Sequence, residues 1–281
     1  MSAPDLRLAL EQFAPRLREP TLNLQRIVRT AGDADLVLTP ELSLTGYDVG
    51  DAVHRLALPI EPNAPLPHGP CDTAAVLVLG AIEQGREAVP YNTAVVVEHG
   101  QVTFKHRKLY LPTYGMFDEA RFFGRGDTIA PFELRGWRIG LLVCEDFWHP
   151  GLTYALAAAG IDVLLVQAAG PGRGVRESAT GEMMFASSAA WDDIARTTAL
   201  LYGIYVGLCN RIGVEGAVTF AGGSLVVGPD GAVITRAGAG EARLEVELQH
   251  AQLARARRPG AHFRDDDPRL VRRALERLAP G

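Results

Sequence analysis

Three side chains of different chemistry each follow an apolar segment of the sequence, and together they could hydrolyse an amide. Cys144 ends the apolar part of RIGLLVCEDFWHP, Glu41 lies in LVLTPELSLTGYDVGD, and Lys108 lies in KHRKLYLPTYGMFDEARFF. A thiol can attack a carbonyl carbon, a carboxylate can carry its proton to the leaving amine, and an ammonium can stabilise the oxyanion. We therefore interpret these residues as one catalytic set.

Each residue of this set also has an ordinary structural interpretation when it is taken alone. A cysteine at a strand end is more often a small core residue, and lone acids and lysines are usually solvated or paired. However, Thr39-Pro40 holds Glu41 at the end of an apolar segment, and LYLP covers the loop of Lys108. The conjunction favours catalysis over three unrelated structural roles.

The nucleophile carries two further expectations. We expect the Cys144 thiol to be partly ionised near neutral pH, as reactive thiols are. Because Cys144 begins a strand-to-helix turn, the backbone N–H of Glu145 is a candidate second donor to the oxyanion. Trp148 follows closely and is a candidate for contact with substrate.

Composition excludes several classes of protein. The chain has 281 residues, of which 47% are hydrophobic, and a formal net charge of -5, which argues against nucleic acid as a partner. No apolar run approaches the ~20 residues that cross a bilayer. Three scattered cysteines and histidines without zinc spacing predict neither a disulfide framework nor a metal site. We expect a cytoplasmic protein.

The hydrophobic pattern alternates between strands and helices. Many strands are near-continuous runs of valine, leucine and isoleucine, which is typical of strands buried on both faces. Two sheets packed face to face and covered by helices would bury them, so we expect an α/β four-layer α-β-β-α sandwich forming one domain over 1–281. We expect strands at 6–14, 36–39, 74–79, 91–97, 101–104, 139–143, 163–167, 204–209, 224–227, 233–235 and 243–248, and helices at 21–31, 152–159, 186–202 and from Pro268.

Five segments resemble those of the nitrilase superfamily of carbon–nitrogen hydrolases. They are PELSLTGY, YNTAVVVEHGQVTFKHRKLYLP, FDEARFFGRGD, GLLVCEDFWHP and NRIGVEGAVTFAGGSLVVGPDGAV. The resemblance implies the same sandwich fold, with Glu41, Lys108 and Cys144 as the catalytic residues and Glu119 as a second carboxylate that orients the lysine. It also implies a homodimer, with 249–281 in oligomer contacts, and neither a metal nor an organic cofactor.

Within that superfamily, PELSLTGY, LPTYGMFDEARFF and CEDFW are most similar to the glutaminase domains of glutamine-dependent NAD synthetases. This likeness implies that Tyr114 and Arg176 bind substrate, and Tyr47 lies in a loop that would shape the same pocket. The chain departs from the group at Gly170, where a serine tends to precede the proline.

These patterns predict a hydrolase that cleaves a linear amide or carbamoyl substrate through a thioester at Cys144 and releases ammonia or an amine. Two alternatives stay open. One is a glutaminase subunit that supplies ammonia to a separate synthetase. The other is a pseudoenzyme whose pocket has become a binding surface.

Overall fold

A computed structural model describes residues 4–115, 117–177, 183–258 and 265–279 of the protein. Its strands are β1 (Leu6–Gln12), β2 (Leu36–Leu38), β3 (Val76–Gln84), β4 (Pro90–Glu98), β5 (Gln101–Arg107), β6 (Phe132–Leu134), β7 (Trp137–Val143), β8 (Val163–Ala168), β9 (Val175–Glu177), β10 (Met183–Phe185), β11 (Tyr205–Asn210), β12 (Ile212–Glu215), β13 (Val218–Ala221), β14 (Leu225–Val227), β15 (Val233–Arg236) and β16 (Ala242–Leu248). Its helices are α1 (Pro20–Thr30), α2 (Val53–Leu56), α3 (Glu119–Phe122), α4 (Pro150–Ala158), α5 (Ala186–Tyr202), α6 (His250–Ala256) and α7 (Pro268–Leu278), with short 3₁₀ turns η1 (Gly50–Ala52), η2 (Arg86–Ala88) and η3 (Cys144–Trp148).

Two six-stranded sheets make up the body of the protein. Their strand orders are β16-β1-β2-β3-β4-β5 and β15-β14-β11-β8-β7-β6. In the first sheet β2 runs parallel to both β1 and β3, and in the second β8 runs parallel to both β7 and β11. Because parallel strands end at the same edge of a sheet, the segments that follow β2 and β7 emerge at defined edges.

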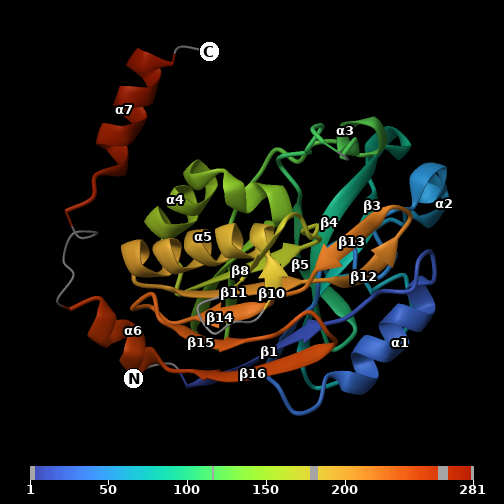
Figure 1. The fold of residues 1–281 in the computed structure, drawn as a ribbon, viewed down its shortest axis with the longest axis horizontal. Helices are drawn as coiled ribbons and strands as arrows, with labels where there is room; N and C mark the ends of the chain where they lie inside the picture. Colours follow the sequence, from blue (N-terminus) through green and yellow to red (C-terminus); the bar gives the residue numbers. More distant parts are fainter. Residues whose placement is uncertain (1–3, 116, 178–182, 259–264, 280–281) are drawn as a thin grey trace.

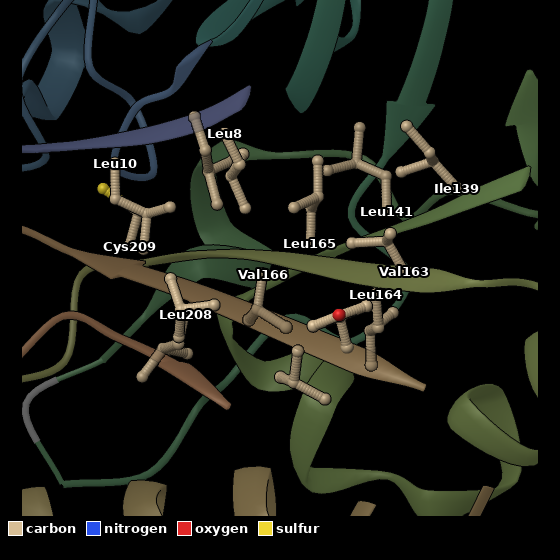
Figure 2. Packing of buried hydrophobic residues seen from close by; sticks show 14 of the residues in the cluster. Leu8, Leu10, Ile139, Leu141, Val163, Leu164, Leu165, Val166, Leu208 and Cys209 are labelled. Atoms are coloured by element: carbon tan, nitrogen blue, oxygen red, sulfur yellow. The ribbon is translucent and has the colours of Figure 1, made fainter. Parts of the chain in front are cut away.

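The largest apolar core lies between the two sheets. Side chains alternate along β1, so that Leu8 and Leu10 join the core shared with the second sheet while Ala9 joins the cluster that contains α1. Figure 2 shows Leu10 next to Cys209 and Leu8 next to Leu165, both residues of the facing sheet. The inner strands β8 and β11 of the second sheet are buried along their whole length, which is why apolar residues dominate their sequences.

Helices cover the outer faces of both sheets. Leu24 and Ile27 of α1 pack in the cluster on the outside of the first sheet, and Ala195 and Ala199 of α5 pack against the second sheet. In Figure 1, α4 and α5 lie on one side of the strands, α1 lies on the other, and α7 stands away from the body. The four-layer α-β-β-α sandwich is therefore confirmed.

The strand limits differ from expectation mainly in the first sheet. The third strand was expected to end at residue 79, but β3 continues through Gly80 to Gln84, and β5 extends to Arg107. Charged residues mark these extensions because buried Glu83 forms ion pairs with Lys105 and Arg107 across the sheet. Several short elements were not expected from the sequence: β6, β9, β10, β12, β13, α2, α3 and α6.

No helix within the described ranges has both the length and the apolar character that spanning a membrane requires.

Candidate active site

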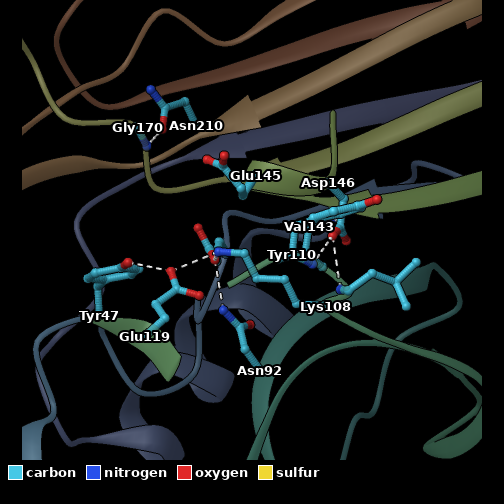
Figure 3. A network of polar contacts seen from close by, with 12 residues as sticks. Tyr47, Asn92, Lys108, Tyr110, Glu119, Val143, Glu145, Asp146, Gly170 and Asn210 are labelled. Carbon is cyan, nitrogen blue, oxygen red and sulfur yellow. Dashed lines mark hydrogen bonds and ion pairs between the residues drawn. The ribbon is translucent and has the colours of Figure 1, made fainter. Parts of the chain in front are cut away.

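Lys108 lies at the centre of a buried cluster of charges. Its ammonium Nζ is 2.7 Å from Glu41 Oε1 and 2.8 Å from Glu119 Oε1. All three side chains are almost completely buried, although they come from segments far apart in the sequence. Figure 3 shows Lys108 and Glu119 meeting, with Asn92 below them. The structure thus brings together three of the four residues predicted to be catalytic in direct contact.

The turn that carries Glu41 is fastened to β3. Leu44 N donates to Gly80 O, and Gly80 N donates to Ser43 Oγ. Leu42, directly after the glutamate, has a φ of 50°, a value that non-glycine residues seldom adopt. The close contact depends on glycine, because a Cβ on Gly80 would lie 2.8 Å from Pro40 O and also press against Leu42 N.

Cys144 is the first residue of η3, directly after β7. It has a φ of 47° and only 8% of its surface is exposed. The charges of Glu41, Lys108 and Glu119 all act on the thiol, which therefore shares their environment. A strained backbone at such a position holds the side chain at a fixed direction at the end of the strand.

The protonation states follow from burial and from the neighbouring charges. Burial opposes the charge on Lys108, but the carboxylates of Glu119 and Glu41 outweigh it and raise the lysine pKa well above its usual value. Burial and then Glu41 raise the pKa of the Cys144 thiol well above its usual value, against the opposing effect of Lys108. The expectation of a partly ionised thiol is therefore wrong: the thiol stays protonated until a base takes its proton.

Glu119 is held from two sides. Tyr47 Oη donates a short hydrogen bond to Glu119 Oε1, the same oxygen that Lys108 contacts. Burial raises the pKa of Glu119 to about 7, with Lys108 opposing and Glu41 adding to the shift. Tyr47 and Glu119 also line a cavity of about 310 Å³, together with Phe117, Phe122 and Val218 among others.

The remaining predicted substrate residues lie in varied surroundings. Tyr114 is 54% exposed, and its hydroxyl donates to Glu145 Oε2 at 2.8 Å. Trp148 packs edge-on against Trp191 and lines a separate cavity between α4 and α5. Arg176 lies in β9, but its side chain is outside the described residues. Contact of these residues with substrate stays a prediction.

Two polar residues at the site were missed by the sequence interpretation. Asn92 Nδ2 donates to Glu41 Oε1 at 2.7 Å, which fixes the oxygen that Lys108 also contacts. The signal was an asparagine close to the start of a strand rich in valine. The second is Asp146, two residues after Cys144, whose carboxylate is fully buried and accepts several backbone N–H groups.

Two facing sheets between helical layers, with a buried ammonium, carboxylates and thiol at the strand ends, define the nitrilase class of fold. The sequence also matches the family model "Carbon-nitrogen hydrolase" over residues 7–258. The chain therefore belongs to the carbon–nitrogen hydrolase family.

Similar proteins include glutamine-dependent NAD(+) synthetases and amidases. The chain is 31% identical over 237 residues to a glutamine-dependent NAD(+) synthetase of Thermotoga maritima, covering 82% of this chain but only 39% of the synthetase. It is 30% identical to an (R)-stereoselective amidase of Pseudomonas sp., covering 92% of this chain and 91% of the amidase.

A solved amidase from Nesterenkonia sp. AN1, a mutant whose active-site cysteine carries the acetamide moiety of fluoroacetamide, has a TM-score of 0.69 to this chain. It is 27% identical, with 94% of this chain and 99% of that one covered.

Proposed function

We propose that this protein hydrolyses a linear amide through a thioester at Cys144. The observation that carries the proposal is the Lys108 ammonium, held between Glu41 and Glu119 at 2.7 and 2.8 Å beside a buried thiol. This arrangement offers a nucleophile, a base and a fixed cation in a site largely closed to water. Electrostatic stabilisation is strongest in such a water-poor environment.

The reaction follows from the positions of these groups. Glu41 takes the proton from Cys144 Sγ as the sulfur attacks the carbonyl carbon, and Lys108 stabilises the oxyanion that forms. Glu41 then returns the proton to the leaving nitrogen, the carbon–nitrogen bond breaks and an amine or ammonia departs. Glu41 next activates a water molecule that hydrolyses the thioester, which releases the carboxylic acid and restores the thiol.

Glu119 and Tyr47 complete the arrangement as positioning residues in this proposal. Lys108 contacts both Glu41 and Glu119. The ammonium therefore keeps Glu119 as a carboxylate partner while Glu41 takes up and releases protons. Tyr47 in turn holds Glu119. The N–H of Glu145 is proposed as a second oxyanion donor.

An amide substrate is favoured by the relatives that match along their whole length. The amidases of Pseudomonas sp. and Nesterenkonia sp. AN1 are both covered over at least nine tenths of their chains. The chain spans 39% of the first matching NAD(+) synthetase, so the activity of that whole protein does not transfer. A glutaminase that supplies ammonia to a separate synthetase is the second candidate, favoured by the 31% identity in that shared part.

The test is a screen of small linear amides, carbamoyl compounds and glutamine, read by release of ammonia. We expect Cys144→Ala to abolish turnover while the far-ultraviolet circular dichroism stays unchanged. Cys71→Ala and Cys209→Ala serve as matched controls, since both thiols are buried and lie outside the charge cluster, and they should keep most of the activity. Equal loss in all three variants would sink the role of Cys144.

The screen and one labelling experiment separate the candidates. A kcat/KM for glutamine well above that for every simple amide would favour the glutaminase. Labelling of Cys144 by a thiol reagent that is lost in Glu41→Gln supports an enzyme. Unchanged labelling in that variant, together with no turnover of any compound, would favour a binding protein with a vestigial site.

We further propose that residues 1–281 act as one catalytic unit in the cytoplasm and that it pairs as a homodimer, with 249–281 in the contact. The support is α7, which exposes Leu270, Leu275 and Leu278 to solvent although it is amphipathic. Exposed apolar stripes of this kind mark surfaces that other proteins cover.

A further inference from the structure

The carboxylate of Asp146 is the meeting point of four hydrogen-bonding groups. Its Oδ1 accepts the backbone N–H of Leu109 and of Tyr110, both at 2.9 Å. Its Oδ2 accepts the N–H of Val143 at 3.2 Å and lies 3.0 Å from His106 Nε2. The residue is fully buried, and Figure 3 shows it between the Lys108 segment and the end of β7.

These partners belong to the two segments that carry the reacting groups. Leu109 directly follows Lys108, and His106 lies in β5 of the first sheet. Val143 directly precedes Cys144 at the end of β7 in the second sheet. One carboxylate therefore ties the ammonium-bearing segment of one sheet to the thiol-bearing turn of the other.

The backbone at the nucleophile gives this tie a physical purpose. Cys144 has a φ of 47°, and a non-glycine residue keeps such a conformation only where its surroundings hold it. The bond from Val143 N–H to Asp146 Oδ2 closes η3 around Cys144. Without it, the turn could relax and carry the thiol away from Lys108.

A carboxyl group fits this position better than an amide does. It accepts hydrogen bonds at both oxygens, whereas an asparagine offers one oxygen and one NH₂ group. An amide in the same place would point N–H groups either at the N–H of Leu109 and Tyr110 or at that of Val143. One side of the tie must then break.

We propose that Asp146 is a positioning residue that sets the spacing between the Lys108 ammonium and the Cys144 thiol. The proposal rests on the hydrolysis proposed above. Asp146 then has a function distinct from that of its neighbour Glu145. The carboxylate of Glu145 accepts a hydrogen bond from Tyr114 at the surface.

The test is Asp146→Asn, assayed well below its thermal midpoint. With an amide identified in the screen, we expect kcat to fall about 100-fold or more, because a misplacement of about 1 Å costs that much, and KM to change less than about threefold. Alkylation of Cys144 by iodoacetamide at pH 7.5 needs no substrate. Its rate should fall about tenfold, because the displaced thiol loses Glu41, the proposed base, and the cation of Lys108. This second readout stands even if the screen finds no substrate.

The direction of the alkylation change separates positioning from a simple charge effect. A carboxylate that acted on the thiol only through its negative charge would disfavour the thiolate, so its neutralisation would speed alkylation. Faster alkylation in Asp146→Asn would overturn the proposal.

Asp162→Asn is the matched control. This carboxylate also accepts a backbone N–H, that of Arg138 near the start of β7, at 3.1 Å, and it pairs with Arg257 at 2.9 Å. We expect Asp162→Asn to lower the thermal midpoint but to leave kcat and alkylation within about twofold of wild type. A comparable loss of kcat in both variants would mean that Asp146 acts only through stability and would overturn the proposal.

His106→Asn is the second variant, for the case in which Asp146→Asn does not fold. It removes one contact to Asp146 Oδ2 and leaves the backbone bonds in place. A fall of about tenfold in kcat, with KM unchanged and with alkylation slowed, supports the proposal. A lowered thermal midpoint with unchanged kcat and alkylation overturns it.

Discussion

At the scale of single residues, the site is governed by one ammonium between two carboxylates. Burial disfavours the ionised forms of Glu41 and Glu119, and the ammonium of Lys108 offsets this cost for both carboxylates. The charge of the same cation also acts on the Cys144 thiol, so one side chain combines a structural role with the catalytic role proposed above. These roles can be separated, since stability responds to the ground state and kcat to the transition state.

Lys108→Met keeps the length of the side chain and removes its charge. We expect kcat to fall by about 10²–10³-fold or more, the usual size for a lost oxyanion donor, with a smaller change in KM. The unpaired carboxylates should also lower the free energy of unfolding by about 3 kcal/mol. Steady-state kinetics and urea unfolding on the same variant measure both effects. Retention of most of kcat in a destabilised variant would leave only the structural role.

Glu119 should make stability depend on pH in an unusual direction. Burial raises its pKa from 4.5 to about 7, so between these values the folded protein holds a proton that the unfolded chain has released. The free energy of unfolding should therefore fall as pH rises through this window, by up to about 3 kcal/mol for this group.

Comparison of wild type with Glu119→Gln in urea at pH 5 and pH 7.5 isolates this contribution. The glutamine at position 119 cannot bind or release a proton. The loss of stability of this variant between the two pH values should therefore be smaller than that of wild type. Glu241→Gln, at an exposed acid, is the control and should keep the dependence of wild type. The same pH dependence in wild type and Glu119→Gln would contradict the raised pKa.

At the scale of elements, the position of Glu41, the proposed base, depends on how closely the turn after β2 approaches β3. Gly80 is the residue that permits this approach, and it lies within β3 rather than at its end. A glycine inside a strand often marks a place where another segment of backbone comes close. Here that segment carries Glu41.

Gly80→Ala should push this turn outward and displace Glu41. We expect kcat to fall about 100-fold and the free energy of unfolding to fall by about 1–3 kcal/mol, as overpacking in a core typically costs. Gly151→Ala in α4 is the matched control, because a Cβ there has nothing within 4 Å. It should keep its activity. Kinetics and urea unfolding of both variants decide whether the close approach matters.

At the scale of the whole molecule, α7 lacks the burial that its amphipathic sequence calls for. Leu270, Leu275 and Leu278 are 56%, 60% and 82% exposed. The segment that precedes α7 in the sequence contacts the body of the protein, because Tyr154 Oη donates to Asp266 Oδ1 at 3.0 Å. A partner subunit that covers the stripe would account for it.

Leu275→Glu combined with Leu278→Glu should therefore weaken the proposed homodimer. Burial of each leucine is worth about 1.5–3 kcal/mol, so the dissociation constant should rise at least tenfold. Sedimentation velocity over a range of concentrations measures it, with Arg272→Ala combined with Glu276→Ala on the polar face as the control. A protein that is monomeric at all concentrations before mutation contradicts the homodimer.

The amino-acid pattern was enough to infer the layered fold and the types of residue at the site. Periodicity and the length of apolar runs are local properties, so the strands that lead to Glu41 and Cys144 could be recognised and their sandwich inferred. The extension of β3 could not, because the buried Glu83 is paired there with Lys105 and Arg107 of β5, which lies two strands away in the sheet.

Tertiary structure alone decided how the site residues are connected. The bonds of Tyr47 to Glu119, of Asn92 to Glu41 and of Asp146 to Leu109 join residues 72, 51 and 37 positions apart. These bonds depend on which distant segments the fold brings side by side, within the first sheet as well as between the two sheets, and no local pattern encodes that. The protonated state of the Cys144 thiol also differed from expectation, because a pKa responds to burial and to charges in space, and sequence spacing reveals neither.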